Sequence, residues 1–236
     1  LGRGETIADT AKIISGYCSA LIIRTFAQSD VDELGAHASI PVINALTDDD
    51  HPTQLLADWL TIRENFGKDI AGRKFVYLGD GNNMSHAWLI MGAIMGAHVV
   101  AATPTGKWAP NPKVVEIAKN IAAKSGGKVE VSHDPEAASK DASVLYTDVW
   151  MSMGDSESER DEKVLALSPF AVTENLFSLT NKDSIFMHCL PAHRGEEVAA
   201  SVIDGPRSVI WREAYHRRTT IQSLLFHLTK GDLKGN

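Results

Sequence analysis

Three short polar clusters combine side chains that can hold a small charged substrate and move a proton. They are His51-Pro52-Thr53-Gln54, Asp148 followed by Ser152-Met153-Gly154, and His188-Cys189-Leu190-Pro191. Between them they supply an imidazole, a carboxamide, a hydroxyl, a carboxylate and a thiol. Such a set of groups favours an enzyme.

The cluster at His51 and two groups of arginines indicate a site for an anion. His51 opens an expected helix, and the start of a helix offers unpaired backbone N–H groups to an anion. Arg24 ends an apolar strand, where a guanidinium group needs an anionic partner, and a ligand phosphate fits that need. The pair Arg217-Arg218 fits simple solvation equally well.

Cofactor and metal interpretations have weaker support. Gly79–Gly81 lacks the third glycine of a dinucleotide fingerprint, and the next expected strand has no acidic residue to bind a ribose hydroxyl. His188, Cys189 and His193 could bind zinc, but no second cysteine or carboxylate pair with ligand spacing accompanies them. We therefore expect no cofactor and no metal. The simplest alternative for Cys189 is an inert buried thiol.

The overall composition argues against several classes of protein. The chain has 236 residues, 44% of them hydrophobic, and a formal net charge of −7. It lacks the clustered Lys and Arg of nucleic-acid surfaces, and its longest apolar stretch, residues 87–102, falls short of the ~18 residues typical of a membrane span. Two cysteines and no signal-like start favour a reducing cytoplasm.

The spacing of apolar residues predicts alternating helices and strands. Expected helices are 6–17, 28–38, 53–65, 84–95, 113–124, 135–140 and 219–230, and expected strands are 20–23, 41–45, 74–78, 98–102, 128–131, 143–147, 184–187 and 208–211. Residues 155–163, rich in charge, are expected to form a mobile loop or lid. The alternation predicts an α/β fold with doubly wound parallel sheets, whose ligands lie at the carboxyl ends of the strands.

The polar clusters, taken in order, resemble the ornithine carbamoyltransferase family of the aspartate/ornithine carbamoyltransferase superfamily. The matching motifs are His51–Asp58, Asn82–Met84, Asp148 with Ser152–Gly154, and His188–Pro191. The likeness extends over essentially the whole chain and implies two doubly wound parallel-sheet domains, the first incomplete here. Residues 1–66 would be the remainder of a carbamoyl-phosphate-binding domain, 67–213 an ornithine-binding domain, and 214–236 a terminal helix returning to the first domain.

The resemblance implies transfer of the carbamoyl group from carbamoyl phosphate to the δ-amine of L-ornithine, giving L-citrulline and phosphate. The residues that would contact carbamoyl phosphate are Arg24, His51, Gln54 and Arg217, with Thr53 lining the site. Those that would hold ornithine are Asn83, Asp148, Ser152 and Met153, with Cys189 and Leu190 between the substrates. The attacking amine must first lose a proton, and Cys189 paired with Asp148 is the predicted relay.

The chain departs from the family pattern at two places. The family's Ser-Thr-Arg-Thr phosphate loop would precede Leu1, so we expect this stretch alone to be inactive. Tyr215-His216-Arg217 stands where Glu-Asn-Arg is usual; Arg217 is the best match for the substrate arginine, and Arg218 is the alternative. The family also implies a homotrimer in which a neighbour completes each site.

Other activities stay open at this point. A putrescine or N-acetylornithine carbamoyltransferase would share the chemistry, although Asp148 suits an acceptor with a free α-amino group. A non-catalytic paralogue is the alternative from another class, and the departure at Tyr215-His216 is its main support.

Overall fold

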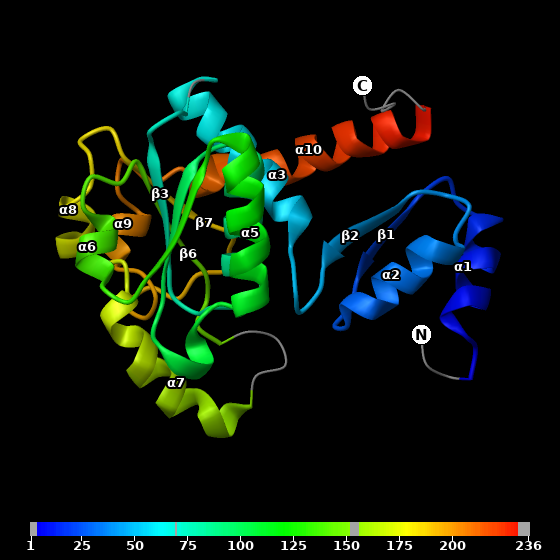
Figure 1. The fold of residues 1–236 in the computed structure, drawn as a ribbon, viewed down its shortest axis with the longest axis horizontal. Coiled ribbons are helices and arrows are strands. Elements are labelled where there is room, and N and C mark those ends of the chain that lie inside the picture. The colour runs from blue at the N-terminus through cyan, green and yellow to red at the C-terminus, as the bar shows by residue number, and fades with distance from the viewer. Residues whose placement is uncertain (1–3, 69, 152–155, 231–236) are drawn as a thin grey trace.

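The computed structural model describes residues 4–68, 70–151 and 156–230, and Ser152 and Met153 lie outside them. Figure 1 shows a smaller unit that contains the start of the chain, a larger unit built around a central sheet, and a long terminal helix. All paired strands in the described ranges run parallel. The predicted α/β class is therefore confirmed.

The smaller unit alternates helices and strands, as its apolar spacing predicts. Its elements are α1 (Ile7–Ser15), β1 (Leu21–Arg24), α2 (Gln28–His37) and β2 (Val42–Leu46). Strands β1 and β2 pair in parallel, with a shift of register between Ile23 and Arg24. Helix α3 (Pro52–Phe66) then leads the chain into the larger unit, and proline fits the first turn of a helix because its missing N–H needs no partner there.

The larger unit is a doubly wound sheet with the strand order β5-β4-β3-β6-β7. These strands are β3 (Lys74–Leu78), β4 (His98–Ala102), β5 (Lys128–Ser132), β6 (Val144–Thr147) and β7 (Ile185–His188). Residues 75–78 and 144–147 are buried throughout, which agrees with their continuous apolar runs, since a sheet covered on both faces needs apolar side chains on both. The winding reverses between β3 and β6, and ligands bind such sheets at the carboxyl edge beside that reversal.

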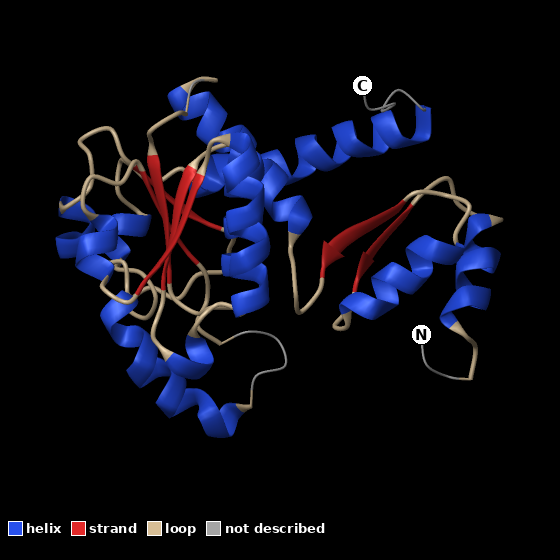
Figure 2. Cartoon of the chain, viewed as in Figure 1, coloured by secondary structure: helices blue, strands red, loops and turns tan. Residues whose placement is uncertain are grey.

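Helices cover both faces of the sheet (Figure 2). On one face, α3, α4 (Asn83–Ile94) and α5 (Pro112–Ser125) share an apolar core with the strands. On the other, the core includes side chains from α6 (Pro135–Ser139), α8 (Glu174–Ser178), α9 (Ala200–Ile203) and η3 (Ser168–Phe170). Gly92 of α4 lies so close to β4 that a Cβ there would be 1.9 Å from a methyl carbon of Val99.

Two predicted elements are wrong. The expected strand at residues 208–211 does not form: Ile210 and Trp211 begin α10 (Ile210–Lys230), and a single bridge between Phe186 and Ser208 remains of the strand pairing. A run of only three apolar residues, Val209 to Trp211, fits a strand or a helix start equally well, so spacing alone could not decide. Helix α10 begins nine residues before its predicted start.

The expected mobile loop at 155–163 is also wrong over its described part. Residues Glu157–Glu159 form the 3-10 helix η2, and α7 (Arg160–Leu167) follows directly. Lys163 is only 2% exposed. The charged side chains of this segment pair with residues that are distant in the sequence, such as Asp80 and Glu196. A run of charges does not by itself reveal such partners.

Helix α10 packs along α3, and the predicted packing of the terminal helix on the first domain stays a prediction. The predicted domain limits stay predictions, but residues 213 and 214 lie inside this continuous helix. Within the described residues, no helix is both long and apolar enough to cross a membrane.

Candidate active site

A cavity of about 810 Å³ opens at the carboxyl edge of the larger sheet. The residues that line it come from the smaller unit, from the start of α3, from the loops after β3, β6 and β7, and from α10. Its lining includes Arg24, Asp48, His51, Asp80, Asn82, Asn83, Asp148, Met151, Cys189, Leu190, His193 and Arg217. The structure thus brings together groups that are up to 193 residues apart in the chain.

Cationic and N–H groups reach the cavity from the smaller unit and α10. His51 immediately precedes α3 and is 6% exposed. Its Nδ1 and the Nε of Arg217 are buried without a hydrogen-bond partner among the described residues. Burial, together with the charges of Arg217 and Arg24, lowers the pKa of His51 to about 3. His51 is therefore neutral near pH 7 and can donate one N–H, and the arrangement suits an anionic ligand.

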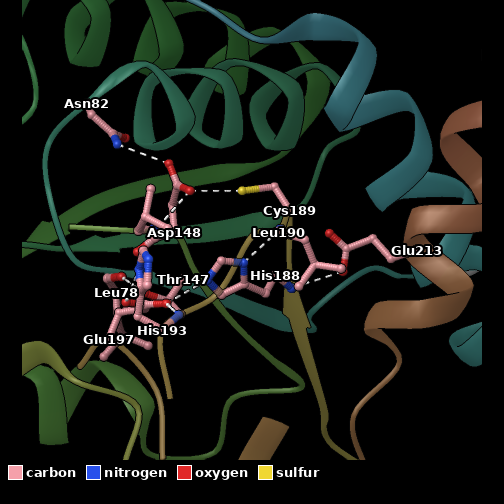
Figure 3. A network of polar contacts seen from close by, with 11 residues as sticks. Leu78, Asn82, Thr147, Asp148, His188, Cys189, Leu190, His193, Glu197 and Glu213 are labelled. Atoms are coloured by element: carbon pink, nitrogen blue, oxygen red, sulfur yellow. Dashed lines mark hydrogen bonds and ion pairs between the residues drawn. The ribbon is translucent and has the colours of Figure 1, made fainter. Parts of the chain in front are cut away.

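Acidic and thiol groups reach the cavity from the sheet edge (Figure 3). Asp148 follows β6 and Cys189 follows β7, and the Cys189 thiol donates to Asp148 Oδ1 over 2.9 Å. Asn82 donates from Nδ2 to Asp148 Oδ2 over 3.2 Å. Burial raises the pKa of Cys189 well above its ordinary value, and the neighbouring Asp148 raises it further. In the ligand-free site the proton therefore resides on sulfur.

The turn that carries Cys189 is fixed from the protein interior. His188 is 1% exposed, and its Nδ1 accepts a hydrogen bond from the Leu190 N–H over 2.8 Å. Its Nε2 lies 3.4 Å from Glu197, which is fully buried. The His188 N–H donates to Glu213 of α10 over 2.9 Å (Figure 3). His188 therefore supports the turn, while the next residue faces the cavity.

The predicted site residues fall into three groups. The cavity is lined by Arg24, His51, Asn83, Asp148, Cys189, Leu190 and Arg217, and Arg218 is exposed elsewhere. Thr53 and Gln54 are buried and not part of the lining: Thr53 donates to the Ala45 carbonyl over 3.1 Å, and Gln54 bonds to side chains of α3 and α10. The predicted ornithine ligands Ser152 and Met153 lie outside the described residues.

The prediction missed several groups. Asn82 was named as part of a motif, and no role was predicted for it. In the structure its Oδ1 caps α4, and its Nδ2 donates to Asp148 and orients that carboxylate. Asp80 lines the cavity and forms an ion pair of 2.6 Å with Lys163 of α7. An isolated Asp-Gly-Asn run marks a strand end, but nothing in the sequence points from Asp80 to a lysine 83 residues later.

The glycine of this loop has a packing role. The Gly81 N–H donates to the Trp108 carbonyl over 2.8 Å, and a Cβ at Gly81 would lie 2.2 Å from the backbone of Ala109. Trp108 belongs to the 3-10 helix η1 (Gly106–Trp108). Close backbone approach thus explains the glycine without a bound dinucleotide.

One group of possible metal ligands occurs among the described residues. Atoms of His193, Glu196 and Glu197 lie within 4.8 Å of one another. Protein groups already contact the two acids, because Arg160 lies 3.0 Å from Glu196, and His188 and His193 lie 3.4 and 3.7 Å from Glu197. We derive no metal chemistry from this group.

Two family models match the chain in sequence. The carbamoyl-phosphate-binding domain of aspartate/ornithine carbamoyltransferase matches residues 1–64, and the aspartate/ornithine-binding domain matches residues 71–228. The chain belongs to the aspartate/ornithine carbamoyltransferase family. Its relatives include the ornithine carbamoyltransferase of Pyrococcus horikoshii, 51% identical over 231 residues, which are 98% of this chain and 72% of that protein. The ornithine carbamoyltransferase of Anoxybacillus flavithermus is also 51% identical, over 97% of this chain and 72% of its own length.

Solved structures of this family have the same fold. The ornithine carbamoyltransferase of Pyrococcus furiosus matches with a TM-score of 0.92 and 49% identity, over 99% of this chain and 74% of the other. The anabolic ornithine carbamoyltransferase of Campylobacter jejuni matches with a TM-score of 0.90 and 36% identity, over 98% and 76%. The residues that line the cavity come from both stretches that the two domain models match.

Proposed function

We propose that this protein is an ornithine carbamoyltransferase, which transfers the carbamoyl group of carbamoyl phosphate to the δ-amine of L-ornithine and releases L-citrulline and phosphate. The observation that carries the proposal is the division of charge in one cavity. Arg24, His51 and Arg217 can donate hydrogen bonds to an anion. The Asp148 carboxylate and the Cys189 thiol, which are hydrogen-bonded to each other, can bind an amine and accept its proton. The relatives of about 50% identity that carry this name support the choice of ornithine.

The reaction needs a neutral δ-amine and a stabilised tetrahedral intermediate. The δ-ammonium gives its proton to Cys189 Sγ, and the thiol proton passes at the same time to Asp148 along the 2.9 Å hydrogen bond. One proton thus leaves the amine, and one reaches the carboxylate. The free amine then attacks the carbamoyl carbon. Arg217 and the His51 N–H would stabilise the developing oxyanion, at roughly 3–4 kcal/mol per positioned donor.

The departure at Tyr215-His216 does not disturb this cavity. His216 is 1% exposed and lies against α3, where its ring nitrogens are 2.8 Å from Thr61 Oγ1 and 3.1 Å from Glu64. Neither Tyr215 nor His216 lines the cavity. The main argument for a non-catalytic paralogue therefore concerns helix packing and not the site.

Citrulline formation by the full-length protein tests the proposal, with putrescine and N-acetylornithine as parallel acceptors. We expect turnover with ornithine, lost in Cys189→Ala and in Asp148→Ala. Cys18→Ala is the matched control, because Cys18 is exposed and free, and it should leave turnover unchanged. Turnover with putrescine or N-acetylornithine alone would replace ornithine as substrate, and no turnover with any acceptor would favour the paralogue.

We also propose a role in arginine metabolism, a cytoplasmic location and a homotrimer or a multiple of it. The support is the family membership and the two unpaired cysteines, which suit a reducing compartment. Light scattering of the full-length protein after gel filtration would give its oligomer size. A monomer at micromolar concentration would contradict the trimer.

A further inference from the structure

Three polar side chains form a buried acid cluster behind the cavity: Gln54 and Asp58 of α3, and Glu213 of α10. They are 1%, 0% and 0% exposed. Gln54 Nε2 donates to Asp58 Oδ1 over 2.7 Å and to Glu213 Oε1 over 3.1 Å. The carbamoyl-transfer chemistry proposed above uses neither acid. Two carboxyls are costly to bury, so their retention needs a reason.

The buried acid cluster connects two parts of the active site. On one side, Arg217 donates to Gln54 Oε1. On the other, Glu213 Oε2 accepts the backbone N–H of His188, the residue before Cys189, as Figure 3 shows. A continuous path of hydrogen bonds thus runs from a cavity-lining guanidinium to the turn that holds the cavity-lining thiol.

The hydrogen bonds also indicate where a proton resides. Both oxygens of Glu213 accept N–H groups, whereas Asp58 Oδ2 has no hydrogen-bond partner among the described residues. Burial raises the pKa of both acids, that of Asp58 to about 7. The other charged or titratable groups that influence the pair are Arg217, Tyr146 and, from the cavity side, Cys189. Because the two carboxyls neighbour each other and both pKa values are raised, one proton shared between them relieves the burial of two charges, while the two N–H contacts of Glu213 are kept.

We propose that Glu213 is a positioning residue for carbamoyl transfer, which holds the Cys189 turn and Arg217 in register through the buried acid cluster, while Asp58 accepts its hydrogen bond in the cluster from Gln54. The inference rests on the proposed function, because it assigns Arg217 and Cys189 to the two substrates. It makes the two acids of one cluster unequal. Glutamine at position 213 puts an amide N–H₂ where one of two acceptors is needed. Asparagine at position 58 keeps the oxygen that accepts the hydrogen bond from Gln54.

The test compares Glu213→Gln with Asp58→Asn in the full-length protein. Loss of a buried hydrogen bond to a charged group predicts that Glu213→Gln lowers kcat about 10- to 100-fold. Asp58→Asn should lower kcat by less than about 5-fold, since the asparagine oxygen can still accept the hydrogen bond from Gln54 Nε2. Glu64→Gln is the control for α3–α10 packing, because Glu64 pairs with Arg212 and His216 without contacting the cluster.

A second readout separates positioning from loss of fold. The rate of Cys189 alkylation, followed by mass spectrometry, should rise in Glu213→Gln and stay near the wild-type rate in Glu64→Gln. Glu213→Asp keeps the charge but shortens the side chain, and it should give the same result where Glu213→Gln fails to fold. Equal kcat losses in Glu213→Gln and Asp58→Asn, or an unchanged Cys189 alkylation rate, would overturn the proposal. If the wild-type protein makes no citrulline, the proposed function fails, and alkylation still decides whether Glu213 holds the turn.

Discussion

Replacing Lys163 should destabilise the protein, because the buried Asp80 carboxylate then loses the lysine with which it pairs. Lys163 and Asp80 lie 2.6 Å apart, with side chains 3% and 9% exposed, and Lys163 Nζ also lies 5.2 Å from the Trp108 ring centre. Lys163→Met keeps much of the buried hydrocarbon and removes only the charge. Asp80 then remains as a buried anion without this partner.

The size of the effect follows from that burial. Removing one partner of a buried ion pair costs about 3–5 kcal/mol, and the lower end applies here because Asp80 opens onto the cavity and gains water. For a domain of this size, about 3 kcal/mol corresponds to a fall in Tm of roughly 6–12 °C. Differential scanning calorimetry of the purified variant measures it.

Two further variants test the reasoning. Asp80→Asn combined with Lys163→Met removes the negative charge that Lys163 balances in the wild type, and the double variant should recover much of the lost Tm. Lys107→Met is the control, because Lys107 is 45% exposed in its ion pairs with Glu159 and Glu162, and exposed pairs add little stability. The reasoning fails if Lys163→Met melts within about 1 °C of the wild type, or if the double variant is no more stable than Lys163→Met.

Two other predictions concern titratable groups. Because burial raises the pKa of Asp58 from 3.8 to about 7, the folded state loses stability as the pH rises between those values, and the loss is complete above about pH 7. Asp58→Asn should therefore gain about 2 kcal/mol of stability relative to the wild type between pH 5 and pH 7. Urea unfolding at both pH values measures this gain, and a constant difference in stability would contradict it. Iodoacetamide at pH 7.5 should label exposed Cys18 well before Cys189, whose thiol has a raised pKa, and equal rates would contradict the buried thiol–carboxylate pair.

The amino-acid sequence by itself determined the parallel α/β class and most element positions. Strands buried on both faces need continuous apolar runs, so 74–78 and 98–102 could be located from their residues alone. The motifs also located much of the cavity lining, since Asp148 and Cys189 each follow a strand of the larger sheet, and the carboxyl ends of parallel strands meet at one edge. Arg24 ends a strand of the smaller sheet and His51 precedes α3, and both face the same cavity. These features are local, and local sequence encodes them.

Tertiary structure alone decided the features that depend on partners distant in the chain. Lys163 looked like part of a solvated charge run until the fold placed it against Asp80. Gln54 and Asp58 follow the motif at His51, but only the packing of α10 on α3 brings Glu213 to them and changes the pKa of the buried acids. Ile210 and Trp211 begin a helix for the same reason, because a short apolar run takes the conformation that its neighbours in space allow.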